Sequence, residues 1–464
     1  MHLVPVSLFA TLAALHVAFA MPYCGLVPPQ PQPRSVAQST GGNTTNGGNS
    51  SSPDQVLATG WYPGWLGATY APSNISWSKY NALTFAFAVT TNDPSVISLD
   101  AQSVTLLPEF VTEAGNNGVS ALLSIGGWTG SLYFSTAVGN AANRSAFVKA
   151  VTGLATKYNL DGIDFDWEYP NRQGLGCNAI SPSDSANFLA FLQQLKQDPV
   201  GSKLILSAAV GETPFMGANG TPMTDVSAFA DVLDHIAIMN YDVWGSFSPT
   251  VGPNSPLDDS CAPTKAGSAV AAVKAWTGAK FPANQVKERC ISLEPAYQTF
   301  LFFFCKIALG VAAYGHSFHV TTSAALGSSG NVNLYPSFDK SQQPLGDSDT
   351  STSASVLDPC GQPEGISGVF NFNGMIAHGF LNSNGTAANG IDYAFDNCSQ
   401  TPFVYNPTAQ TMLSYDDARS FAAKGNYISS NGLLGFAVWP VTGDYNDILL
   451  GAISDAMGIV QICS

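Results

Sequence analysis

Charge is scarce in this chain and unevenly divided. Asp, Glu, Lys and Arg make up 11% of its 464 residues, and 32 acidic side chains outnumber 17 basic ones. The formal net charge of −15 argues against nucleic acid and anionic membrane surfaces as partners, because both are polyanions. Aromatic residues are as frequent as charged ones, at 11%. This balance suits a protein that contacts a neutral, hydrogen-bonding ligand.

Metal-binding patterns are also missing from the sequence. The eight cysteines form no CxxC motif and no Cys/His cluster with metal-ligand spacing, so we expect no metal and no cofactor. In an oxidising compartment such cysteines form disulfides. Sequence proximity alone suggests that Cys177 pairs with Cys261 and that Cys360 pairs with Cys398.

The N-terminus lacks a hydrophobic run long enough for an ordinary membrane span. Residues 1–20 are apolar but are interrupted by His16, and they end in the small-x-small sequence Ala18-Phe19-Ala20. This pattern predicts a secretory signal peptide rather than a membrane anchor, and hence an extracellular protein. Residues 21–54 are dominated by Pro, Gln, Ser, Gly and Asn, which predicts a disordered linker that could hold the protein near a cell wall. Acceptor sequences for N-glycosylation begin at Asn43, Asn49, Asn74, Asn143 and Asn384.

Residues 55–464 alternate short apolar runs with segments of helical period. Eight runs are near-continuously apolar, as in strands buried on both faces: 57–61, 83–89, 120–125, 162–167, 204–210, 235–239, 307–314 and 433–439. Amphipathic helices are expected between them, for example at 144–157, 184–196 and 264–276. The alternation predicts an α/β protein with a (β/α)8 TIM barrel. A doubly wound open sheet is the alternative, but the phosphate-cradling Gly-rich turn typical of it is missing.

Two segments interrupt the alternation. Residues 319–400 are rich in Gly, Ser, Asn and Asp and contain strand-like runs such as 368–372, which predicts a small inserted α+β subdomain. Residues 287–306 include Thr-Phe-Leu-Phe-Phe-Phe-Cys, and removing them would join a normal helix-to-strand loop to the next strand. Because Phe and Leu codons are pyrimidine-rich, we interpret this segment as a retained intron; a genuine hydrophobic loop is the alternative.

Three carboxylic acids stand at alternate positions in Asp-Gly-Ile-Asp-Phe-Asp-Trp-Glu, residues 161–168. On a strand, the spacing of Asp164, Asp166 and Glu168 directs all three side chains to one side. Like charges so close cannot all ionise, so they must share protons, bind a cation or perform acid–base chemistry. A Ca²⁺ or Mg²⁺ site is the main alternative, but one barrel strand is poorly placed to surround a cation. Asp161, at the start of the strand, is expected to be structural.

The octapeptide resembles the DGxDxDxE signature of glycoside hydrolase family 18, the chitinases and their relatives. Other landmarks of that family occur in order: residues 124–128 (SIGGW), 239–242 (MNYD), 310–315 (GVAAYG), 414–417 (SYDD) and 435–439 (GFAVW). The resemblance extends over nearly all of residues 55–460. Within that family, the chain resembles secreted, fungal-type chitinases with an insertion between the seventh and eighth strands.

The resemblance implies a substrate-assisted, retaining mechanism, in which the sugar's 2-acetamido oxygen is the nucleophile. Glu168, nearest the carboxyl end of its strand, is then the general acid and base. Asp166 orients the acetamido group, and Asp164 tunes Asp166. Tyr241 hydrogen-bonds the acetamido oxygen, and Asp242 supports the same subsite.

Aromatic side chains are expected to bind the sugars. By resemblance Trp439 forms the floor under the distorted sugar, Trp128 and Trp65 stack on neighbouring sugars, and Tyr314 lines the cleft. Met239 and Gly127 belong to the same motifs and are further substrate-binding candidates, although packing or close backbone approach is the alternative for Ser124, Gly126 and Gly127. Core packing is the preferred interpretation for Trp77, Trp276 and Phe87.

The expected function is that of a chitinase that hydrolyses β-1,4-linked N-acetylglucosamine, acting as a monomer on chitin or chitooligosaccharides. An endo-N-acetylglucosaminidase acting on glycoprotein glycans and a non-catalytic chitin-binding lectin are the alternatives. Lectins of this family typically lose the acidic glutamate, whereas Glu168 is present. A structural secreted protein would leave the carboxyl cluster unexplained. The chain departs from the family pattern at Gly315-His316, where many relatives have Arg, which puts substrate contacts there in doubt.

Overall fold

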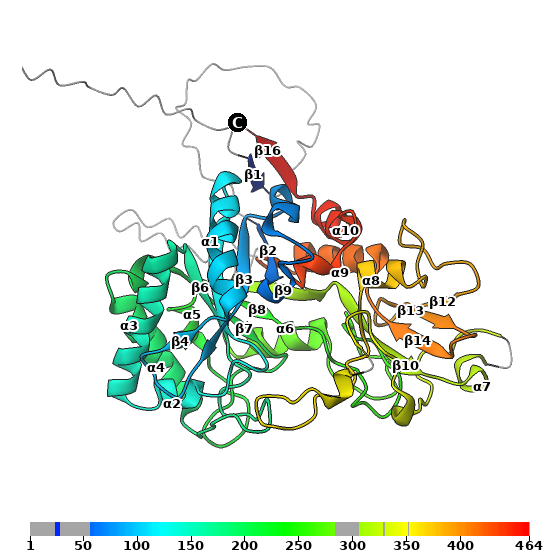
Figure 1. Cartoon of the computed structure of the whole chain (residues 1–464), viewed down its shortest axis with the longest axis horizontal. Coiled ribbons are helices and arrows are strands. Elements are labelled where there is room, and N and C mark those ends of the chain that lie inside the picture. The colour runs from blue at the N-terminus through cyan, green and yellow to red at the C-terminus, as the bar shows by residue number, and fades with distance from the viewer. Residues whose placement is uncertain (1–23, 28–55, 284–305, 328–329, 351, 464) are drawn as a thin grey trace, which may run out of the picture.

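A closed barrel of eight parallel strands forms the centre of the computed structural model, which describes residues 24–27, 56–283, 306–327, 330–350 and 352–463 (Figure 1). The strands are β2 (Leu57–Pro63), β3 (Ala82–Thr90), β5 (Ser120–Gly126), β6 (Gly162–Asp166), β7 (Ile205–Val210), β8 (His235–Ile238), β9 (Ile307–Ala312) and β15 (Gly435–Trp439). They pair in the order β2-β15-β9-β8-β7-β6-β5-β3, and pairing of β2 with β3 closes the barrel. The short β4 (Ile97–Ser98) adds antiparallel to β3. The predicted barrel is thus confirmed.

The barrel strands form where the sequence is apolar on both faces. Every residue of β6, β8 and β9 is buried, and β8 and β9 accordingly show no polar alternation, whereas β6 alternates apolar residues with Asp164 and Asp166. Each of the eight apolar runs overlaps one barrel strand, although β2, β3 and β5 extend beyond their runs and the run 307–314 also reaches the first residue of β10. Helices cover the outside of the barrel and the inserted region: α1 (Ala101–Asn116), α2 (Phe134–Val138), α3 (Ala141–Tyr158), α4 (Asp184–Gln197), α5 (Ser227–Ala230), α6 (Ala269–Gly278), α7 (Thr322–Ala325), α8 (Phe372–Ala377), α9 (Ala418–Ser430) and α10 (Ile448–Met457).

Capping side chains set where several helices begin. The helix expected from residue 264 begins later, at Ala269, because the Ser268 hydroxyl accepts a hydrogen bond from the Ala271 amide and makes Ser268 the N-cap. Asp417 and Ser420 form a reciprocal capping box at the start of α9. Short 3-10 helices lie at Gly64–Leu66, Pro72–Asn74, Trp77–Lys79, Gly201–Lys203, Lys340–Gln342, Ser353–Ser355 and Val441–Gly443.

A second sheet lies between β9 and β15 in the sequence, beside the barrel (Figure 1). It is antiparallel, with the strand order β11-β10-β14-β13-β12. Its strands are β10 (Tyr314–His319), β11 (Val369–Asn371), β12 (Asp392–Asp396), β13 (Thr401–Asn406) and β14 (Thr411–Ser414). The sheet therefore extends beyond residues 319–400 on both sides. Its own apolar cluster includes Phe318, Phe403, Tyr405 and Met412.

Residues near the two ends of the chain pair with each other. Strand β1 (Cys24–Val27) runs antiparallel to β16 (Val460–Cys463). This corrects the expectation that all of residues 21–54 lack regular structure. The predicted signal peptide at 1–20 lies outside the described residues, and so does the predicted intron segment at 287–306 except for Lys306. The Lys306 ammonium donates hydrogen bonds to the carbonyls of Ala230 and Leu233, at 2.7 Å each.

The disulfides differ from those suggested by sequence proximity. Cys177 bonds to Cys360, and Cys261 bonds to Cys398. Each bond joins a loop of the barrel to the inserted region, over 183 and 137 residues of sequence respectively. The prediction was wrong because the fold brings these loops together in space, and nothing in the spacing of the cysteines reports it.

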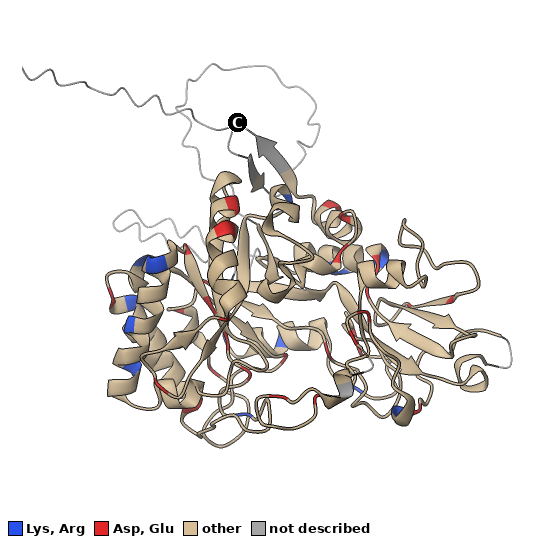
Figure 2. Ribbon diagram, in the orientation of Figure 1, with Lys and Arg blue, Asp and Glu red and all other residues tan. Residues whose placement is uncertain are grey.

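Charged residues are sparse along the ribbon (Figure 2). Several of the basic ones, including Arg144, Lys149 and Lys157, lie on α3 in the outer helix layer. Across the part of the chain that the structure describes, no helix is both long and apolar enough to cross a membrane.

Candidate active site

Asp164 is held inside the barrel by donors from three other strands. It is 1% exposed, and its carboxylate accepts hydrogen bonds from Trp61 Nε1 at 3.0 Å, Ser124 Oγ at 2.8 Å and Ser207 Oγ at 2.7 Å. Ser124 therefore donates a hydrogen bond to the Asp164 carboxylate, a role beyond the packing expected from sequence. Because three donors engage both of its oxygens, Asp164 is a fixed negative group beneath the other two acids.

The Asp166 carboxyl, unlike that of Asp164, is buried with one oxygen that accepts no hydrogen bond from the described residues. It is 5% exposed, and its Oδ1 atom makes no hydrogen bond to any described residue. Burial raises the pKa of the Asp166 carboxyl well above its ordinary value, and the charges of Glu168 and Asp164 raise that pKa further. No hydrogen bond joins the side chains of Asp164 and Asp166 among the described residues, so the two acids interact through their charges. A buried carboxyl without a partner is equipped to bind a polar ligand group.

Glu168 follows β6 and is oriented through its backbone. Its amide donates to Ser131 Oγ at 3.0 Å, and its carbonyl accepts from Asn178 Nδ2 at 2.9 Å. Burial raises the pKa of the Glu168 side chain to about 7, and the charge of Asp242 also raises this pKa. A hydrogen bond from Tyr169 and the charge of Arg172 lower the same pKa. The acid therefore holds its proton close to neutral pH, as a general acid must.

The segment after β8 brings Tyr241 and Asp242 to the same end of the barrel. Asp242 has a left-handed backbone, with φ of 55°, and its Oδ1 accepts hydrogen bonds from the Tyr314 hydroxyl at 2.8 Å and from His316 Nε2 at 2.7 Å. Burial raises the pKa of Tyr241 well above its ordinary value, and Asp166 is the largest of the charges that add to this. Asp166, Glu168, Tyr241 and Asp242 are thus mutually close.

His316 was a residue of doubtful role from sequence, and the structure gives it a partner. Strand β10 begins at Tyr314, directly after β9, so Tyr314 and His316 point to the same side at alternate positions. Both reach the Asp242 carboxylate. The spacing of two was visible in the sequence, but the start of a new strand at residue 314 was not.

Partly exposed aromatic rings from β3, β15 and the segment after β2 lie close to one another. Trp439 is 6.0 Å from Trp65 and 5.8 Å from Phe87 between ring centroids, and Trp65 is 51% exposed. Phe87 is partly buried and packs against the small buried cluster that includes Trp61 and Ala86, which agrees with the packing role expected for it. Trp128, at the end of β5, is 50% exposed.

Other motif residues have packing roles or neighbours at the site. Gly127 has φ of +80°, and a Cβ there would stand 3.1 Å from the ring of Phe87. Met239 is partly buried in the small cluster that includes Trp439. By contrast, Trp77 and Trp276 are buried in the main core, as expected.

A metal-dependent arrangement finds no support in the geometry. Within the described ranges, no group of three or more His, Cys, Asp or Glu side chains is arranged to hold a metal ion. Asp164 is already occupied by three donors, and Asp166 and Glu168 lie among tyrosines. The arrangement can supply a proton from Glu168 and an acceptor from Asp166 to one bound molecule.

Comparisons with known proteins agree on the family. The model for glycosyl hydrolases family 18 matches residues 59–444. A chitinase-like effector of Moniliophthora perniciosa is 44% identical over 98% of this chain and 99% of its own length. Chitinase A1 of Niallia circulans is 30% identical over 72% of this chain and 42% of its own length. The crystal structure of a chitinase from Rhizomucor miehei superposes with a TM-score of 0.71 at 32% identity, over 87% of this chain and all of that one. The chain belongs to family 18 of the glycosyl hydrolases.

Proposed function

We propose that this protein is a chitinase that hydrolyses β-1,4 linkages between N-acetylglucosamine units with retention of anomeric configuration. The observation that carries the proposal is the arrangement at the end of β6. There a carboxyl with its pKa raised to about 7, Glu168, stands near the buried carboxyl of Asp166, whose Oδ1 has no hydrogen-bond partner among the described residues. Two acids with such different surroundings suit a proton donor and a substrate-orienting group.

In the first step the acetamido carbonyl oxygen of the substrate forms a bond to C1 of its own sugar. The glycosidic C1–O bond breaks, and the departing oxygen takes the proton of Glu168. Asp166 accepts a hydrogen bond from the acetamido N–H, and the Tyr241 hydroxyl donates to the acetamido oxygen as the oxazolinium forms. In the second step water adds to C1, its proton passes to Glu168, and the bond from C1 to the acetamido oxygen breaks.

Binding of chitooligosaccharides without turnover is the second candidate function. It is favoured by the name of two similar relatives, the chitinase-like effectors of Moniliophthora perniciosa and Moniliophthora roreri, which are 44% and 45% identical to this chain. The presence of Glu168 beside Asp166 and Tyr241 favours hydrolysis instead. The two candidates differ in a single measurement, the release of new reducing ends.

The test uses the purified chain with chitohexaose. We expect new reducing ends to accumulate with time, and proton NMR of the first products to show the β-anomer. Stable binding of chitohexaose with no new reducing ends would replace the proposal with the binding function. Early release of the α-anomer would contradict the retaining mechanism.

The pH dependence of kcat/KM is predicted from the same carboxyl. Glu168 must be protonated to act as the acid, and burial raises its pKa to about 7, so activity is retained below that pH and falls about tenfold per pH unit above it. Arg172 lowers the pKa of Glu168, so Arg172→Gln should move the alkaline limb to higher pH. An alkaline limb near the ordinary pKa of a carboxyl would contradict this assignment.

We also propose that the protein is exported and acts on extracellular chitin as a monomer. The apolar residues 1–20 support export. The disulfides Cys177–Cys360 and Cys261–Cys398 support an oxidising compartment. Size-exclusion chromatography with light scattering of the protein recovered from culture medium tests both points.

A further inference from the structure

We propose that Asn254 is a positioning residue, which holds Tyr241 and Asp242 in their places relative to Glu168; this inference rests on the proposed hydrolytic function. Asn254 lies in the long connection between β8 and α6 and is completely buried. A buried amide in a loop must find partners for both its donor and its acceptor. The partners of Asn254 all belong to segments that form the site.

Four hydrogen bonds connect Asn254 to these segments. Its side-chain Oδ1 accepts from the Asp242 amide at 2.9 Å, and its Nδ2 donates to the Tyr314 carbonyl at 3.0 Å. Its backbone amide donates to Ser414 Oγ at 2.8 Å, and its carbonyl accepts from the Val243 amide at 3.1 Å. One residue therefore joins the exit of β8, the start of β10 and the end of β14.

The hydrogen bonds of Asn254 and Tyr314 together fix both the backbone and the side chain of Asp242. The amide side chain holds the backbone of both Asp242 and Tyr314, while the Tyr314 hydroxyl holds the Asp242 carboxylate. Asp242 adopts a backbone φ of 55°, a conformation that residues other than glycine adopt at a cost in free energy. The surrounding contacts must supply the free energy that keeps it there. Asn254 satisfies the Asp242 amide directly.

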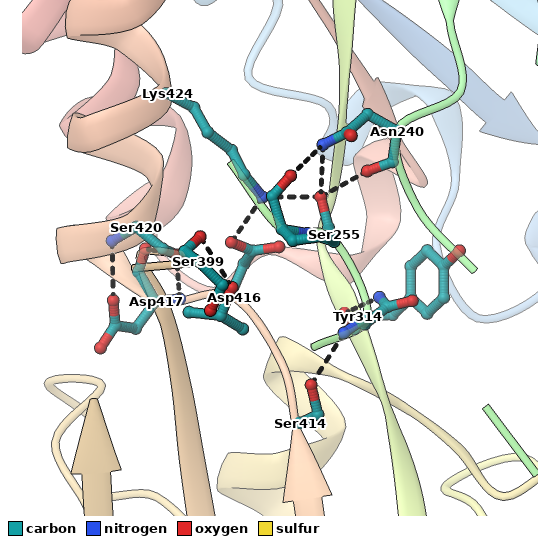
Figure 3. Close-up of polar contacts among 12 residues, drawn as sticks. Asn240, Ser255, Tyr314, Ser399, Ser414, Asp416, Asp417, Ser420 and Lys424 are labelled. Carbon is teal, nitrogen blue, oxygen red and sulfur yellow. Dashed lines mark hydrogen bonds and ion pairs between the residues drawn. The ribbon is translucent and has the colours of Figure 1, made fainter. Parts of the chain in front are cut away.

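Ser255 holds Asn240, the residue before Tyr241, in a similar way. Its hydroxyl donates to the Asn240 carbonyl and accepts from Lys424 Nζ at 2.6 Å. Lys424 reaches from α9 and also donates to Asp416 Oδ1 at 2.7 Å (Figure 3). Asn254 and Ser255 together hold backbone groups of residues 240, 242 and 243, so the catalytic segment is anchored to the end of the inserted sheet.

Displacing Asp242 should alter Glu168 in a measurable direction. The charged and titratable groups that act on Glu168 come from its own segment and from the segment after β8: Tyr169, Arg172, Asp166, Tyr241 and Asp242. Asp242 is the member of this set that Asn254 holds. Asn254→Ala removes both side-chain bonds, whereas Asn254→Asp keeps an acceptor for the Asp242 amide and loses the donor to Tyr314.

The experiment measures turnover of chitohexaose and binding of a thiazoline analogue of the oxazolinium intermediate. We expect Asn254→Ala to lower kcat about 10- to 100-fold, as for a misplacement of about 1 Å, with KM changed by less than about threefold. Analogue affinity should fall by a factor close to that in kcat. The alkaline limb of the pH profile should move to lower pH, since Asp242 raises the pKa of Glu168. Asn254→Asp should give a smaller loss of kcat.

Tyr405→Phe is the matched control. It removes a buried hydroxyl of β13 whose hydrogen-bond partners are the Val320 carbonyl and Thr322 Oγ1, just after β10 in the inserted region. A kcat loss in Asn254→Ala no larger than that in Tyr405→Phe, or an unmoved alkaline limb, would overturn the proposal. If Asn254→Ala does not fold, Asn254→Asp decides by its loss of kcat relative to that of Tyr405→Phe, and the pH criterion is not applied to it because the new carboxyl itself acts on Glu168. Wild-type protein without turnover would contradict the proposed function, and analogue affinity would then decide the role of Asn254 alone.

Discussion

Glu168→Gln is expected to lower kcat on chitooligosaccharides about 100- to 10,000-fold, because the change removes the proposed general acid and base. The amide has nearly the shape of the acid, so the backbone bonds of Glu168 to Ser131 and Asn178 should persist. Binding of chitohexaose should therefore change by less than about threefold. Reducing-end release and isothermal titration on the same preparation measure the two quantities.

The chain offers a matched control for this substitution. Glu109 is exposed on the surface of α1, and Glu109→Gln should leave both kcat and binding unchanged. A Glu168→Gln variant that keeps more than a tenth of wild-type turnover would show that the proton comes from another group. A loss of binding as large as the loss of turnover would indicate that Glu168 acts mainly in substrate binding.

The same pair of measurements separates this chain from a binding protein that keeps a chitinase fold. A family 18 fold by itself does not establish catalysis, because function depends on the site. If wild-type protein and Glu168→Gln bind equally and neither releases reducing ends, the acid is not used. A difference in turnover with equal binding assigns hydrolysis to Glu168.

Much of the fold could be predicted because burial on both faces leaves a direct trace in the sequence. All eight barrel strands overlap the apolar runs, since a strand covered on one side by helices and on the other by the barrel interior tolerates few polar residues. The alternate spacing of Asp164, Asp166 and Glu168 likewise follows from strand geometry. Family resemblance then identified Tyr241 and Trp439, which the spacing of the acids alone does not.

Long-range contacts could not be predicted in the same way. The connections of Asn254 to Tyr314 and Ser414 join residues 60 and 160 positions apart, and no periodicity in the chain reports them. The predicted disulfide pairings were wrong for the same reason, since sequence proximity favoured the wrong partners.

Lys424→Met is expected to give the largest loss of stability, about 3–5 kcal/mol in the free energy of unfolding, as found when one partner of a buried ion pair is removed. Lys424 and Asp416 are 2.7 Å apart, and both side chains are completely buried. The ammonium group opposes the rise that burial imposes on the pKa of Asp416. Without it, an ionised Asp416 would lie in an apolar interior. Urea unfolding of the oxidised protein measures the loss.

The pH dependence of that loss shows whether the unpaired carboxylate causes it. In Lys424→Met the folded-state pKa of Asp416 should rise further above its unfolded value. A carboxyl with a raised folded pKa binds its proton more tightly when folded, so the variant should lose stability as pH rises from the unfolded pKa to the folded one. The difference from wild type should therefore be smaller at pH 4 than at pH 7. Adding Asp416→Asn to Lys424→Met should restore most of the stability at pH 7.

An exposed ion pair in the same chain provides the comparison. Lys280 and Asp225 are 2.6 Å apart, but their side chains are 65% and 48% exposed. Solvent screens such a pair, so Lys280→Met should cost less than about 1 kcal/mol. Similar losses for Lys424→Met and Lys280→Met, or a loss that does not depend on pH, would contradict the role assigned to the buried pair. A large loss confined to Lys424→Met, and relieved by Asp416→Asn, would show that this ion pair stabilises the junction between α9 and the segment that carries Tyr241 and Asp242.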